Sequence, residues 1–70
     1  MSVQERLVAA DEAIQGGDEK SVNVALELLN AALSDAKEGA KGAIGRAIVA
    51  AKDHDVGGCR AAIEDAKKAA

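Results

Sequence analysis

Apolar residues recur every three or four positions along nearly the whole chain, with polar residues between them. The clearest run places them at positions 22, 26, 29, 33 and 36, the spacing of a heptad seam on an α-helix. Similar runs precede and follow it. The pattern predicts an all-α protein, an up-down four-helix bundle built from two αα-hairpins, with helices at about 2–15, 19–38, 42–53 and 56–69 in a single domain.

Local signals accompany most of these boundaries. Ser2 and Glu5 form an S-x-x-E capping box at the start of the first predicted helix. Gly16 and Gly17 can end that helix, because glycine readily adopts the left-handed conformation found after helix ends, and Asp18 can cap the next helix. Each of these signals therefore predicts a helix end from short-range chemistry alone.

Three glycines complicate the middle of the chain. Gly39, Gly42 and Gly45 fall within seven residues, and each costs the interior of a helix about 1 kcal/mol relative to alanine. We therefore expect a break near residues 39–42 rather than one long helix, or a close helix crossing at the glycines.

The composition predicts a thin core. The chain has 70 residues and no Phe, Tyr or Trp, and 17 of its residues are alanine, which buries little area. A chain this short is marginally stable alone, so we expect it to form a homo-oligomer or to bind a protein partner through its aliphatic seam. The seam residues expected in the core or at an interface are Leu7, Ile14, Val22, Leu26, Leu29, Leu33, Ile44, Ile48 and Ile63.

Charge divides unevenly between the two halves. Residues 1–38 carry eight acidic and three basic side chains, whereas residues 39–70 carry four acidic and six basic ones. This asymmetry can steer two hairpins or two subunits against each other, or it can be an ordinary solvated surface. The net charge of −3, the lack of aromatic residues and the lack of an Arg-rich helix argue against nucleic-acid binding. No apolar stretch is long enough to span a membrane.

One short segment collects potential metal ligands. His54, Asp55 and Cys59 offer imidazole, carboxylate and thiolate, which suit Zn²⁺ or Cu²⁺, although their spacing matches no established zinc signature. A structural interpretation accounts for the same residues: Asp55 caps a helix, His54 lies near a helix end, and Cys59 occupies a seam position. No nucleophile, base and orienting group come together in the sequence, so we expect no catalytic residues and no cofactor other than such a metal.

Two segments resemble a known family. The run EAIQGGDEKSVNVALELLNAALSDAK, residues 12–37, is similar to the repeat unit of the bacterial small metal-binding proteins, and AIVAAKDHDVGG, residues 47–58, resembles a later hairpin of that family. The resemblance implies an exported up-down four-helix bundle that binds divalent transition metals through many histidines. Only His54 corresponds to those histidines in this chain.

These observations favour a non-enzymatic helical bundle that acts by self-association or protein–protein interaction. One alternative is a small protein that binds or sequesters divalent metal. A further alternative is a designed or selected bundle without biological function, although the glycines and the unpaired Cys59 are unusual for a design. The N-terminal residues lack an apolar signal region, so we expect a cytoplasmic protein, or a periplasmic or exported one if a leader has been removed.

Overall fold

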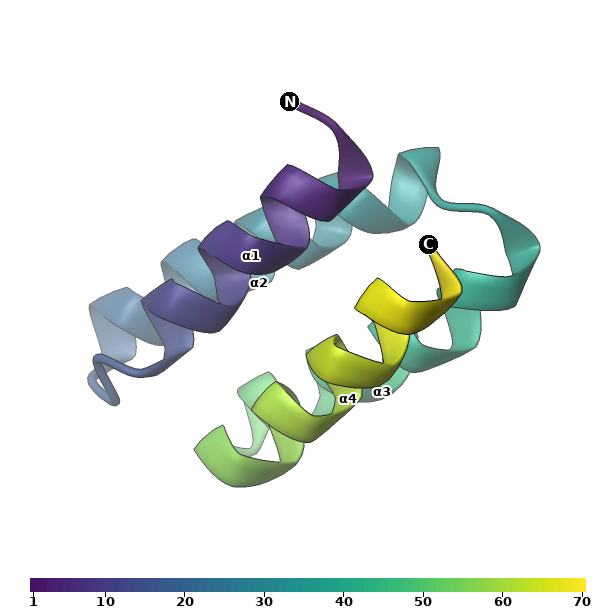
Figure 1. Cartoon of the computed structure of the whole chain (residues 1–70). Helices are drawn as coiled ribbons and strands as arrows, with labels where there is room; N and C mark the ends of the chain where they lie inside the picture. Colours follow the sequence, from purple (N-terminus) through teal and green to yellow (C-terminus); the bar gives the residue numbers. More distant parts are fainter.

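The chain folds into four α-helices that run alternately up and down (Figure 1), as the computed structural model shows for all 70 residues. They are α1 (Val3–Ile14), α2 (Glu19–Asp35), α3 (Glu38–Lys52) and α4 (Val56–Ala69). There is no strand, and both chain ends lie at the same end of the molecule. The predicted all-α, four-helix architecture is confirmed.

Two helical hairpins make up the bundle. The most extensive packing joins α1 to α2 and α3 to α4, whereas α2 with α3 and α1 with α4 close the bundle through smaller contacts. Figure 1 shows the first hairpin and the second hairpin as two distinct helix pairs lying side by side. Each hairpin is therefore more tightly packed within itself than against the other.

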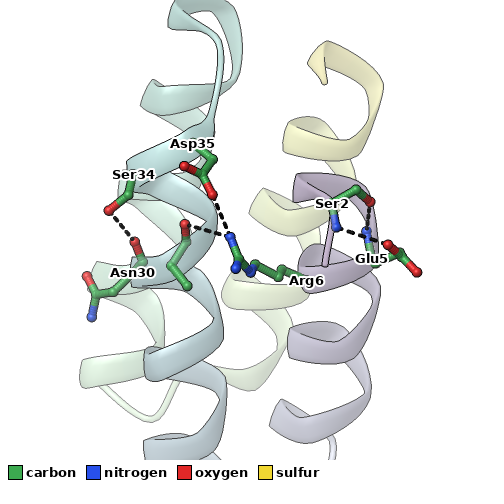
Figure 2. A network of polar contacts seen from close by, with 7 residues as sticks. Ser2, Glu5, Arg6, Asn30, Ser34 and Asp35 are labelled. Atoms are coloured by element: carbon green, nitrogen blue, oxygen red, sulfur yellow. Dashed lines mark hydrogen bonds and ion pairs between the residues drawn. The ribbon is translucent and has the colours of Figure 1, made fainter.

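Capping side chains define three of the four helix starts. The Ser2 N–H donates to Glu5 Oε1 at 2.9 Å and the Glu5 N–H donates to Ser2 Oγ at 3.1 Å, so the predicted capping box is present (Figure 2). The hydrogen bond from the Ser2 backbone is the main reason that the pKa of Glu5 lies below its ordinary value. Asp18 accepts from Ser21 at the start of α2, and Asp55 accepts from Gly58 at the start of α4. Only α3 begins without a side-chain cap.

The predicted break between the second and third helices was wrong in position. The chain leaves α2 at Asp35 rather than near residue 38, and α3 begins at Glu38 rather than near residue 42. Only Ala36 and Lys37 separate the two helices, and both have extended backbones, with φ/ψ of −75°/151° and −71°/154°.

Burial of small apolar side chains explains why α3 starts before its glycines. Ala40 and Ala43 are buried, and helical geometry through this segment is what brings them to the core face with Ile44. A Cβ added at Gly39, Gly42 or Gly45 would meet nothing within 4 Å, so these glycines lie on the outer side and mark no helix crossing within the chain. Packing of one face therefore outweighs the low helix propensity of the other.

The core contains 17 buried residues, and nine of them are alanine. Of the nine predicted seam residues, seven are buried, while Leu26 and Leu33 are partly exposed and pack against the core. Six core side chains larger than alanine are fully buried: Leu7, Ile14, Leu29, Ile44, Cys59 and Ile63. The aliphatic volume at the centre of the bundle is small, as the composition indicated.

Candidate functional site

The turn between α3 and α4 holds the residues that the sequence singled out as metal ligands. His54 has a left-handed backbone with φ of 57°, the only non-glycine residue in this conformation. Its N–H donates to the Ala51 carbonyl at 3.0 Å, and the Asp55 N–H donates to the Ala50 carbonyl at 2.9 Å. These two bonds form a Schellman motif that ends α3. The backbone of His54 thus has a structural role, and its side chain is exposed.

Asp55 and Cys59 are engaged in different ways. The Asp55 carboxylate accepts the Gly58 N–H at 2.9 Å and so caps α4, while Cys59 is 0% exposed and belongs to the core. Burial, with smaller contributions from the Asp11 and Asp55 carboxylates, raises the pKa of the Cys59 thiol. A protonated, buried thiol is a poor nucleophile and a poor metal ligand.

The structure does not gather the three candidate ligands around one point. His54 is exposed in the turn, Asp55 faces the first turn of α4, and Cys59 points into the core. No group of three or more His, Cys, Asp or Glu side chains is arranged to hold a metal ion. Asp11, which the sequence did not single out, is the carboxylate that acts on Cys59 from another helix.

A shallow groove of about 620 Å³ runs along the outer side of α3. The residues that line it are Gly42, Gly45, Arg46, Val49, Ala50, Asp53 and Asp55. Val49 is 61% exposed, the most exposed large apolar side chain within the helices. The missing side chains of the two glycines leave this face of α3 uncovered.

A second groove, of about 470 Å³, lies on α1. Met1, Val8 and Ala9 supply its apolar surface, and Glu5 and Glu12 border it. Val8 is 40% exposed, and Val24 on α2 is 41% exposed. Three helices thus each carry one exposed valine.

The sequence reasoning missed these valines because it followed only the main seam. Val24 lies two residues from Val22, or about 200° around a helix, and Val49 directly follows Ile48. Helical phase alone places both away from the buried stripe, so this signal was available in the sequence.

Three ion pairs link different helices. Arg6 of α1 pairs with Asp35 of α2 at 2.7 Å and also donates to the Ala31 carbonyl at 3.4 Å (Figure 2). Arg46 of α3 lies 3.5 Å from Asp65 of α4.

The third ion pair is the one that crosses between the hairpins. It joins Arg60 of α4 to Asp11 of α1 at 3.1 Å. Arg60 belongs to the more basic half of the chain and Asp11 to the acidic half. The pair therefore joins the two hairpins as the uneven division of charge would favour. Because Arg60 is about half exposed, this pair contributes at most about 1 kcal/mol.

Comparisons with known proteins find no match, whether with protein-family models, curated proteins or solved structures. The resemblance to the bacterial small metal-binding proteins therefore stays a prediction. No helix in the structure combines the length and apolar character needed to cross a membrane.

Proposed function

We propose that this protein is a non-enzymatic helical bundle that acts by associating with proteins, and first of all with further copies of itself. The observation that carries this proposal is the distribution of apolar volume. Nine of 17 core residues are alanine, whereas three valines on different helices keep exposed surface: Val8 is 40% exposed, Val24 41% and Val49 61%. A single copy therefore has a thin core and keeps apolar surface outside it.

Association offsets both features. A valine side chain that passes from full exposure to full burial contributes about 1.5 kcal/mol or more, and Val49 retains well over half of its surface for such a contact. Formation of a complex also stabilises the folded chain by mass action, because only folded copies associate. A marginally stable monomer thus gains stability as an oligomer.

The titratable groups support a role without catalysis. All side chains that carry charge lie at the surface, and no buried polar side chain lacks a hydrogen-bond partner. Two of the three shifted pKa values belong to the helix caps Glu5 and Asp18, and the third belongs to the buried Cys59. Helix capping accounts for the first two shifts and burial for the third, so none of these three shifts calls for a catalytic role.

Sedimentation equilibrium of the native chain tests this proposal. We expect the mass-average molecular weight to rise as the protein concentration increases from about 1 μM to about 1 mM. Dissociation constants in this range correspond to association free energies from about 8 to about 4 kcal/mol in favour of the complex. The thermal midpoint should rise over the same range. Repeating the measurement in high salt distinguishes apolar contacts from ionic ones, because only ionic contacts weaken there.

A folded monomer at every concentration, with a midpoint that does not depend on concentration, refutes self-association. Association that disappears in high salt refutes the argument from apolar surface.

A further inference from the structure

We propose that α2 and α3 can join into one continuous helix, and that two copies then form an antiparallel dimer by exchanging hairpins. In this dimer the first hairpin of each copy packs on the second hairpin of the other copy. The inference rests on the proposed self-association and gives a route to it that does not require burial of Val8, Val24 or Val49. It commits to a second copy of this chain as the partner.

The junction between α2 and α3 lacks the signals that end helices elsewhere in the chain. Gly17, with φ of 74°, and the Asp18 cap separate α1 from α2, and a Schellman motif with the Asp55 cap separates α3 from α4. At the α2–α3 junction there is no left-handed residue, no proline and no side-chain cap on α3. Ala36 and Lys37, which form it, are both good helix formers.

The apolar stripe crosses this junction in helical phase. Positions 25, 29, 32, 36, 40, 43, 47 and 51 are spaced three or four residues apart and are all alanine or leucine. All are buried in the folded chain except Ala36, which is partly buried. If Ala36 and Lys37 became helical, these residues would form one uninterrupted stripe from α2 into α3. The sequence is therefore compatible with a long helix whose core face never changes side.

A continuous helix also pairs backbone groups that the break leaves open. In the separate helices, the first N–H groups of α3 receive no side-chain cap, and the last turn of α2 has carbonyl groups beyond its internal bonds. Joining the helices lets the N–H groups of residues 37–39 bond to the carbonyl groups of residues 33–35. Within a single copy, this joining would remove the packing of the second hairpin onto the first.

A second copy can supply that packing. The helices of each hairpin pack more extensively against each other than against the other hairpin, so opening the junction disrupts the smaller set of contacts. In the exchanged dimer α2 packs on α3 and α1 packs on α4 as before, now between copies. The Arg60–Asp11 ion pair, which joins the hairpins at 3.1 Å, becomes an intermolecular pair. The exchanged dimer thus restores the packing between hairpins that opening disrupts, and it adds the joined helix.

The shape of the exchanged dimer differs clearly from that of the monomer. The Cα atoms of the folded chain extend over 29 Å in the longest direction. A single helix from Glu19 to Lys52 would be about 50 Å long at about 1.5 Å per residue. Small-angle scattering therefore gives a maximum dimension that no single closed copy can reach.

Lys37→Pro is the decisive variant. Lys37 has φ of −71°, which proline adopts without strain, and Ala36 before it is extended, as a residue preceding proline prefers. The closed monomer therefore accepts proline, whereas the interior of the joined helix does not. Lys37→Ala is the matched control, because it also removes the Lys charge but keeps a strong helix former.

The experiment unfolds the native chain and both variants, refolds them at high concentration, and measures their mass by sedimentation. We expect the native chain and Lys37→Ala to form dimers with a maximum dimension of about 50 Å or more. Lys37→Pro should weaken dimerisation by more than a hundredfold, since proline disfavours each joined helix by about that factor. Circular dichroism should show that the Pro variant remains folded.

Two results would overturn the proposal, and they differ in their consequence for the proposed function. If Lys37→Pro forms dimers as strongly as the native chain, copies associate by their surfaces, so hairpin exchange is wrong and self-association stands. If the native chain stays monomeric after refolding at high concentration, both hairpin exchange and self-association are wrong.

Discussion

Replacement of His54 by glycine should stabilise the bundle, because His54 is the one non-glycine residue with a left-handed backbone, φ 57°. An L-residue in this conformation costs about 1–2 kcal/mol relative to the right-handed one. Glycine avoids that cost, but its greater conformational freedom in the unfolded chain lowers the free energy of unfolding by about 0.4–1 kcal/mol. The exposed imidazole makes no hydrogen bond to offset the change. We therefore expect His54→Gly to raise the free energy of unfolding by about 0.5–1 kcal/mol.

Urea and thermal unfolding followed by circular dichroism measure this change. For a domain of this size, about 0.5–1 kcal/mol corresponds to a rise of roughly 3–7 °C in the thermal midpoint. Two variants serve as controls. His54→Ala removes the imidazole but keeps the strained backbone, so it should not stabilise. Gly17→Ala, at φ 74° and with nothing within 4 Å of the added Cβ, should destabilise by about 1 kcal/mol.

The reasoning fails if His54→Ala stabilises as much as His54→Gly, because the side chain rather than the backbone would then be the cause. It also fails if His54→Gly lowers the free energy of unfolding. All measurements should be made at one low protein concentration, since association shifts the apparent midpoint.

Three further predictions concern a glycine, the thiol and two acids. Gly42→Ala should raise the free energy of unfolding by up to about 1 kcal/mol in urea titrations, because the added Cβ meets open space and alanine favours the helix; a loss of stability would contradict this. Cys59 should react with a disulfide reagent only as fast as the bundle opens, since it is buried with a raised pKa, so a rate equal to that of an unfolded control would be evidence against the packing. The lowered pKa values of Glu5 and Asp18 stabilise the folded chain above their ordinary values of 4.5 and 3.8, and this stability should be lost as pH falls below that range. Glu5→Gln should remove the Glu5 part of the acid response, because the amide does not titrate, and an unchanged pH profile for this variant would count against the capping box.

Short-range patterns predicted most of the local structure. Ser2 with Glu5, the Gly16–Asp18 turn and Asp55 each mark a helix end through hydrogen bonds between residues at most five apart, so no knowledge of the tertiary structure was needed. The predicted seam was nearly the buried core, because the 3.6-residue period places its members on one face. Leu26 and Leu33 depart from it only in degree, being partly exposed where the neighbouring helices do not cover them.

The candidate metal residues show where sequence proximity was insufficient. His54, Asp55 and Cys59 lie within six residues, but their side chains point in different directions around the start of α4. The His54 side chain is exposed to solvent, the Asp55 carboxylate accepts a backbone N–H, and Cys59 lies in the core. Direction, rather than distance along the chain, determines whether side chains can share a ligand, and direction depends on where the helix begins. The influence of Asp11 on Cys59 comes from a different helix and has no signal in the sequence.

The sequence by itself determined four helical segments, three of their caps and the face that each helix buries, because all of these depend on residues within one or two turns of each other. Only the tertiary structure decided where α2 stops and α3 starts. The chain has no local signal at Ala36 and Lys37, and its glycines favour a later break, but burial of Ala40 and Ala43 against the other helices selects the earlier one. The free energy that favours the earlier break therefore comes from packing between helices. Because the apolar stripe continues through the junction, the local sequence is compatible both with two separate helices and with one continuous helix.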